Sequence, residues 1–166
     1  MIKIRIGIVD DHSIVRTGLR QFFEDQSDLQ VVGEAGSGGE AIDLVRKTEM
    51  DVLLMDLSMP GQTGIDALAM IRAKAPDVAI LILSGYPEEH YALNLIRQGA
   101  SGYLSKQCEP SEIVTAIRTV AQGRRHITPA VAELLAQQLT RPDAGLPHEQ
   151  LSEREFQVFV RLAKGE

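Results

Sequence analysis

The sequence of 166 residues is poor in several residue types, and each scarcity excludes a class of protein. It has one cysteine, Cys108, so it forms neither an internal disulfide nor a zinc site built from several thiolates, and we interpret Cys108 as an incidental thiol. Tryptophan is absent and aromatic residues make up only 4% of the chain, so the core must be mainly aliphatic. No apolar run approaches the roughly 20 residues of a membrane-spanning helix, and the chain does not start with an apolar signal segment. These absences favour a reducing, cytoplasmic setting.

A positive surface is also missing. Lysine and arginine number 17 against 23 aspartates and glutamates, which gives a formal net charge of −6 at pH 7. Nucleic-acid-binding domains are usually basic, so this stretch of chain does not itself resemble one.

The apolar residues, 44% of the chain, fall into five short runs separated by segments of helical periodicity. The runs, which we predict to be strands, cover residues 4–9, 30–35, 52–56, 78–83 and 102–106. Ser13 is expected to cap the first of the helices that follow them, and Ser37 and Glu40 have the capping-box spacing at the start of the second. The other three helices are expected to start at Thr63, Glu88 and Pro110. Strands that alternate with helices, without hairpin turns, predict a parallel sheet covered on both faces. The predicted fold class is therefore α/β, a flavodoxin-like doubly wound sheet of five strands in the order 2-1-3-4-5.

This alternation ends near Gly123, so we predict a first domain over residues 1–123. Residues 124–150 are interpreted as a linker whose last part is rich in proline and glycine. A helix is expected within it, near 129–140, because Thr128 can cap it and a proline suits its first position.

Residues 151–166 carry the signals of one more helix. Ser152 and Glu155 have the spacing of a capping box, and apolar residues share one face of the helix that follows. A single amphipathic helix has nothing of its own to pack against. We therefore expect this segment to be the beginning of a second domain that continues beyond Glu166.

Three acids stand where two neighbouring strands are expected to end. Asp10 and Asp11 follow the first strand, and Asp56 ends the third. In a sheet of this order these strands lie side by side, so the carboxylates meet at the edge where open α/β sheets place their chemistry. Carboxylates so close repel one another, and a divalent cation relieves that repulsion. Magnesium suits one or two carboxylates with a carbonyl and water, and the Ser58 carbonyl can complete such a set.

Two further polar groups are predicted to reach the same edge. Lys106 ends the fifth strand, and Ser84 ends the fourth, beside Gly85. An ammonium, a hydroxyl and a metal around one carboxylate are suited to forming a phosphorylated acid. The carboxylate attacks phosphorus, and the cations offset charge on the transferring oxygens.

Each of these residues alone also has a purely structural interpretation. Acids after a strand are often turn residues or helix caps, as Asp10, Asp11 and Asp56 could be. A lone lysine such as Lys106 is usually a solvated surface group. We interpret His12 as a polar residue at a helix start and assign it no role. The order of the residues is what makes the set specific. The first strand ends in an acid pair, the third in a single acid, the fourth in a hydroxyl and the fifth in a lysine.

This order resembles the receiver domain of two-component response regulators over residues 3–123. The resemblance rests on Asp10-Asp11-His12, Met55 to Gly61 with Gly64, Ser84-Gly85, Gly99 to Leu104, and Lys106. The stretch from Asp11 to Leu19 resembles the NarL/FixJ subfamily, whose output domain is a LuxR-type helix-turn-helix. Residues 151–155, with Val158 and the run from Ala163 to Gly165, resemble the start of that output domain.

The resemblance implies a role for each group at the edge. Asp56 would receive a phosphoryl group from a phosphohistidine of a partner histidine kinase, and Lys106 would pair with that group. Asp11, Asp56 and the Ser58 carbonyl would hold Mg²⁺ directly, while Asp10 would act through water.

The resemblance also implies a switch. Ser84 would hydrogen-bond to the phosphoryl group and move inward, and Tyr103 would follow. The added charge would change the surface around the fourth and fifth helices, and homodimerisation and DNA binding by the output domain would follow. The chain would then be a phosphorylation-switched transcriptional regulator, and not an enzyme that acts on a separate substrate.

Departures from the family pattern and rival families complete the interpretation. Gln107 follows Lys106 where many receivers have proline, which leaves the cis or trans state of that peptide open, and Ser84 replaces the commoner threonine.

A haloacid-dehalogenase-type phosphatase would need a second aspartate at Ser58. A flavodoxin-like nucleotide binder would need a phosphate-cradling loop where the acid pair stands. The remaining alternative is a stand-alone or atypical receiver that acts by protein contact without binding DNA.

Overall fold

The structure is a computed structural model, and it describes residues 2–56, 64–85 and 88–139 of the chain. The strands are β1 (Ile4–Val9), β2 (Leu29–Ala35), β3 (Val52–Asp56), β4 (Ala79–Ser84) and β5 (Gly102–Ser105). The helices are α1 (Ser13–Glu24), α2 (Gly38–Lys47), α3 (Gly64–Lys74), α4 (Glu88–Arg97), α5 (Pro110–Ala121) and α6 (Pro129–Leu139). No helix within the described ranges is long and apolar enough to cross a lipid bilayer.

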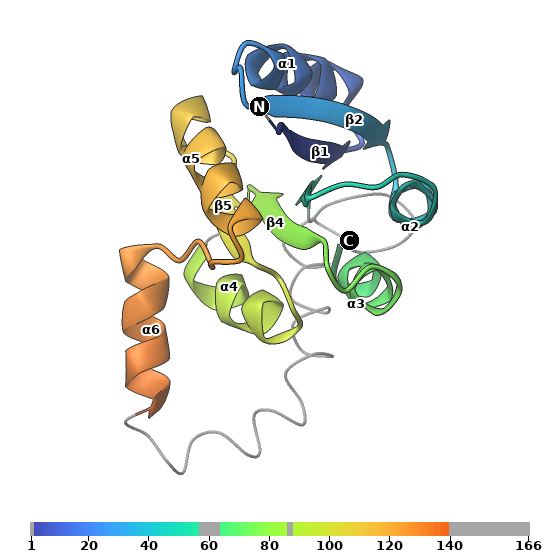
Figure 1. Cartoon of the computed structure of the whole chain (residues 1–166). Coiled ribbons are helices and arrows are strands. Elements are labelled where there is room, and N and C mark those ends of the chain that lie inside the picture. Colours follow the sequence, from blue (N-terminus) through green and yellow to red (C-terminus); the bar gives the residue numbers. More distant parts are fainter. Residues whose placement is uncertain (1, 57–63, 86–87, 140–166) are drawn as a thin grey trace.

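The five strands form one parallel sheet in the order β2-β1-β3-β4-β5. Helices α1 and α5 cover one face of it, and α2, α3 and α4 cover the other (Figure 1). The predicted doubly wound fold and its strand order are confirmed. Because all strands point the same way, their carboxyl ends share one edge of the sheet.

The central strand β3 shows how the sheet is buried. Leu53 and Met55 pack into the apolar cluster beneath α2, α3 and α4, whereas Val52 and Leu54 pack into the cluster beneath α1 and α5. Both faces of β3 are therefore covered, which explains why its run is apolar without alternation. Only its last residue, Asp56, is charged, and it lies at the edge where the carboxyl ends of the strands meet.

The start of α2 follows the predicted capping signal. The Ser37 side chain accepts a hydrogen bond from the backbone N–H of Glu40 at 3.2 Å. The Glu40 carboxylate in turn accepts from the backbone N–H of Gly36 at 2.8 Å. Two N–H groups at the helix start thus find acceptors, which stabilises the turn into α2.

The expectation that Ser13 caps α1 was wrong. His12 occupies the N-cap position in an extended conformation, and Ser13 is the first helical residue. The reason is local: the backbone N–H of His12 donates to Asp10 Oδ1 at 2.8 Å, which holds His12 outside the helix. The predicted helix start at Thr63 lies outside the described residues.

Helix α6 packs against the rest of the described chain through α4. Val131 is buried in the same apolar cluster as Leu95 and Ile96 of α4. The segment before α6 lies beside the start of β5, because the backbone N–H of His126 donates to the Ser101 carbonyl at 2.9 Å. The proposed start of a second domain at 151–166 lies outside the described residues.

We predict that Gly102→Ala weakens the junction between β5 and the segment before α6. A Cβ at residue 102 would lie 2.9 Å from each of three atoms, the Cβ and carbonyl oxygen of His126 and Cδ1 of Leu81, so the backbone must shift. We expect the free energy of unfolding to fall by about 1–3 kcal/mol, as measured by urea denaturation. Gly18→Ala is the control, because nothing lies within 4 Å of its Cβ in α1. A Gly102→Ala protein as stable as the wild type would contradict the packing described.

A second prediction concerns the ion pair that joins the starts of β1 and β3. Asp51 Oδ2 accepts from the backbone N–H of Arg5 at 2.8 Å and from its Nε at 3.2 Å. The side-chain hydrogen bond from Arg5 is the main reason that the pKa of Asp51 lies below its ordinary value. A lowered carboxyl pKa stabilises the folded state at neutral pH, and this contribution is lost as the pH falls through that pKa.

Asp51→Asn should therefore lower the free energy of unfolding at neutral pH by about 1 kcal/mol or less, since the pair is partly exposed. Wild type and variant should converge below about pH 4 in urea denaturation followed across pH. Asp43→Asn, at an exposed acid on α2, is the control. If the difference in unfolding free energy between the wild type and Asp51→Asn stayed constant as the pH fell below about 4, the lowered pKa of Asp51 would be contradicted.

Candidate functional site

The pairing of the strands brings the predicted polar groups to one edge. Val9 of β1 is paired with Met55 of β3, so the residues that follow, Asp10 and Asp56, leave the sheet side by side. Asp56 is in turn paired with Leu83 of β4, next to Ser84. Ser84 is paired with Ser105, the residue before Lys106. The parallel register therefore brings two acids, a hydroxyl and a lysine together from the ends of four strands.

Burial distinguishes this edge from the rest of the described chain. Within the described ranges, the buried polar side chains are Asp10, Asp56 and Ser84, with 2%, 2% and 0% of their surface exposed. A carboxylate is seldom buried unless a cation or hydrogen bonds offset its loss of hydration. Two buried carboxylates at one place therefore indicate a site and not a turn.

Lys106 is the cation that faces the two buried carboxylates. Its Nζ lies 3.2 Å from Asp56 Oδ2 and 3.6 Å from Asp10 Oδ2, and its side chain is 30% exposed. Burial by itself would lower the pKa of the Lys106 ammonium, but the charges of Asp56 and Asp10 and its hydrogen bonds to them raise it above its ordinary value. The ammonium therefore stays protonated beside Asp56. Its backbone N–H donates to the Ser84 carbonyl at 2.8 Å, which ties it to the end of β4.

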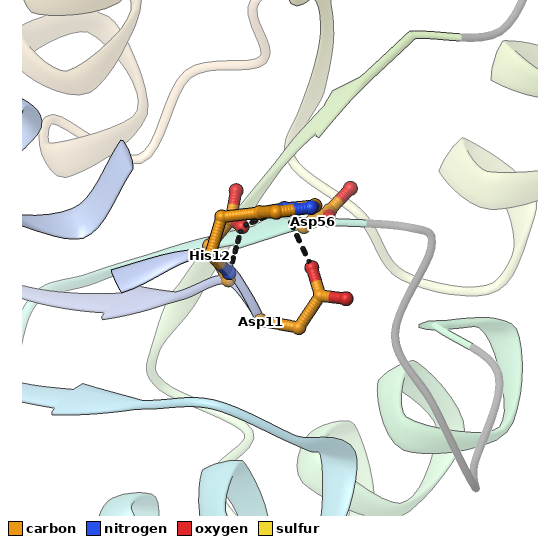
Figure 2. A group of neighbouring side chains, drawn as sticks. Asp11, His12 and Asp56 are labelled. Carbon is orange, nitrogen blue, oxygen red and sulfur yellow. Dashed lines mark hydrogen bonds and ion pairs between the residues drawn. The ribbon is translucent and has the colours of Figure 1, made fainter. Parts of the chain in front are cut away.

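Asp11 and His12 belong to the same group of side chains (Figure 2) and are more exposed than Asp10. His12 Nδ1 is 2.9 Å from Asp11 Oδ1 and 3.2 Å from Asp10 Oδ1. The sequence interpretation gave His12 no role, so the structure adds it to the site. The signal that could have indicated it is its position directly after the acid pair, where the chain has not yet entered α1.

Arg16 is a second residue that sequence reasoning missed. Its Nη1 donates to the backbone carbonyl of Asp10, and its Nε donates to Glu34 at 3.2 Å. The guanidinium thus connects the end of β1 to β2 and fixes the backbone that carries Asp10. Its place one turn into α1 gives it that reach.

The donor atoms at this edge fit a divalent cation. One ligand atom from each of Asp10, Asp11, His12 and Asp56 lies within 4.8 Å of the others. Opposite ligands of an octahedral Mg²⁺ are about 4 Å apart, because each bond is about 2.1 Å. A single ion can therefore reach all four with small side-chain adjustments. Ser58, whose carbonyl was expected to complete the set, lies outside the described residues.

The structure also places the two predicted switch residues. Ser84 is fully buried at the end of β4. Tyr103, the second residue of β5, is 1% exposed and lies in the apolar cluster beneath α2, α3 and α4. No peptide bond in the described chain is cis, so the bond between Lys106 and Gln107 is trans.

Comparison with known proteins agrees with this geometry. A family model described as "Response regulator receiver domain" matches residues 6–118. The chain is 40% identical over 164 residues to the response regulator UvrY of Escherichia coli K12, covering 98% of this chain and 75% of UvrY.

Solved structures with similar folds include a LuxR-family two-component response regulator from Aurantimonas sp. SI85-9A1. It is 40% identical, has a TM-score of 0.76, and the match covers 83% of this chain and 99% of that one. A structure of two RcsB dimers bound to two parallel DNAs is 28% identical with a TM-score of 0.72, and the match covers 80% of this chain and 67% of RcsB. The chain therefore belongs to the response regulator receiver family and is a two-component transcriptional response regulator of the NarL/FixJ type.

Proposed function

We propose that Asp56 is the phosphoryl acceptor of this response regulator and that a partner histidine kinase supplies the group. The observation that carries the proposal is the burial of Asp56 at a strand end with an ammonium 3.2 Å from its Oδ2. Of the acids at this edge, Asp56 ends the central strand β3, and Asp10 and Asp11 flank it from β1. That arrangement supports one nucleophile with its neighbours as metal ligands.

The transfer can be written for the groups present. An Asp56 oxygen forms a bond to phosphorus while the bond from phosphorus to the kinase imidazole breaks, and the imidazole keeps the electron pair. Lys106 faces the acceptor oxygen and offsets charge that gathers on the transferring group. Mg²⁺, held by Asp10, Asp11, Asp56 and the Ser58 carbonyl, would neutralise further charge on the phosphoryl oxygens. The protein acts as its own phosphoryl acceptor in this scheme.

We propose that the signal leaves the site through Ser84 and Tyr103. A phosphoryl group adds close to two negative charges and several acceptor oxygens. Ser84 lies at the end of β4 with a hydroxyl that can donate to such oxygens, and Tyr103 lies on the neighbouring strand, packed against the α2–α4 side of the core. Movement of these two side chains would change α4, and α6 is packed against α4.

The output belongs to the same proposal. Residues 1–123 would form the receiver, 124–150 the linker, and 151–166 the beginning of a LuxR-type DNA-binding domain. Phosphorylation would favour a homodimer that binds DNA in the cytoplasm through that domain. The DNA-bound RcsB dimers are a precedent among proteins of similar fold.

Phosphorylation is tested by incubating the chain with acetyl phosphate and Mg²⁺ and measuring its intact mass. We expect the wild type to gain the mass of one phosphoryl group, and Asp56→Asn to gain none. Asp43→Asn, at an exposed acid on α2, should be labelled like the wild type. A chelator should abolish labelling because the buried acids then repel the incoming phosphate. Equal labelling of Asp56→Asn and the wild type would reject Asp56 as the acceptor.

Charge balance at the site generates a separate prediction about stability in metal-free buffer. Asp56→Asn should raise the free energy of unfolding by about 1 kcal/mol, because one ammonium then faces one buried carboxylate fewer. Lys106→Met should lower it by about 2 kcal/mol, because both buried carboxylates lose their cation. Urea denaturation with a chelator present gives both values. Changes of the same sign in the two variants would show that charge does not determine stability here.

A further inference from the structure

His12 is a histidine whose ring is turned toward the acids and away from its helix. It occupies the N-cap position of α1, yet its side chain makes no capping hydrogen bond. The side chain is 64% exposed, but its Nδ1 lies next to Asp11 Oδ1 (Figure 2). The same Nδ1 also lies next to Asp10 Oδ1. A ring in this position offers a nitrogen to the site and keeps its other edge in solvent.

The two distances fit adjacent ligands of one ion. Bonds of about 2.1 Å at right angles put neighbouring ligand atoms about 3 Å apart. His12 Nδ1 is 2.9 Å from Asp11 Oδ1 and 3.2 Å from Asp10 Oδ1. Asp10 Oδ1 already accepts the backbone N–H of His12 at 2.8 Å, so the ring nitrogen is not needed to satisfy that oxygen.

The Lys106 ammonium and the His12 ring face different oxygens of the Asp10 carboxylate. Asp10 Oδ2 faces the Lys106 ammonium, whereas Asp10 Oδ1 faces His12. Asp56 Oδ2 likewise faces Lys106. An ion beside Asp10 Oδ1, Asp11 Oδ1 and His12 Nδ1 would therefore lie on the side of Asp10 that does not face the ammonium.

We propose that His12 Nδ1 is a ligand of the divalent cation in this site. Compared with a site that has only oxygen ligands, this nitrogen increases the preference for ions such as Co²⁺ and Ni²⁺ over Mg²⁺. The inference rests on the proposed function, because it extends the metal site assigned there to Asp10, Asp11 and Asp56. Imidazole nitrogen strengthens binding of later transition metals, whereas Mg²⁺ prefers oxygen. His12 is thus a determinant of which metal the receiver takes up.

The test compares wild type, His12→Gln and the control His126→Gln, which replaces a histidine beside β5 at the opposite edge of the sheet. Calorimetric titration with Co²⁺ and with Mg²⁺ at about pH 8, above the pKa of a free imidazole, measures both affinities. We expect the Co²⁺ affinity of His12→Gln to fall about tenfold or more, which is the usual effect of removing a side chain that supports a metal site. Its Mg²⁺ affinity should stay within about twofold of the wild-type value. His126→Gln should keep both affinities. Circular dichroism with a chelator present checks that each variant is folded.

Pulsed electron paramagnetic resonance of bound Mn²⁺ gives a direct second readout. Modulation from an imidazole nitrogen should be present in the wild type and in His126→Gln, and absent in His12→Gln. Bound Mn²⁺ without nitrogen modulation in the wild type, or equal Co²⁺ affinity in His12→Gln, would overturn the role of His12 and leave phosphorylation of Asp56 standing. Metal-independent labelling of Asp56, with no cation bound at all, would overturn the metal site of the proposed function as well.

Discussion

The structure depends on one electrostatic arrangement, in which two buried carboxylates share one ammonium. Asp10 and Asp56 are almost fully buried, and Lys106 Nζ lies 3.6 Å and 3.2 Å from their Oδ2 atoms. Charges held out of water interact more strongly than the exposed ion pairs on the surface, which contribute roughly 0–1 kcal/mol each. The aliphatic side chains of the sheet keep water away from these charges, and the parallel register of the strands brings the charged side chains close together.

This arrangement is incomplete in charge. Three carboxylates, Asp10, Asp11 and Asp56, meet one ammonium, so a negative excess is left at the edge of the sheet. A bound divalent cation would remove that excess, and the proposed phosphoryl group on Asp56 would restore part of it. A site whose net charge changes at each event is suited to a switch, because each change of charge must be answered by movement of nearby groups.

The sequence predicted the parts of the site that follow from the order of the strands. Asp56, Ser84 and Lys106 end consecutive strands along the sheet, and a parallel sheet of this type puts such ends together whatever the side chains between them. His12 and Arg16 were missed because their contacts depend on local backbone geometry. The side chain of Asp10 accepts a hydrogen bond from the backbone N–H of His12, so His12 takes the N-cap position and α1 begins one residue earlier than a cap at Ser13 would give, and the ring turns inward. A pattern of residue types does not predict which residue occupies the N-cap position or which way the His12 ring turns.

The length of α6 would enlarge any displacement passed on to it by α4. It is seated on α4 through Val131 in a shared cluster with Leu95 and Ile96, and Arg97 of α4 binds Gln138 near its far end. Its 11 residues span about 16 Å at 1.5 Å per residue. A tilt of roughly 10° passed on by α4 would carry its far end about 3 Å, by that same length. A displacement passed on by α4 would therefore be larger at the C-terminal end of α6 than at Val131.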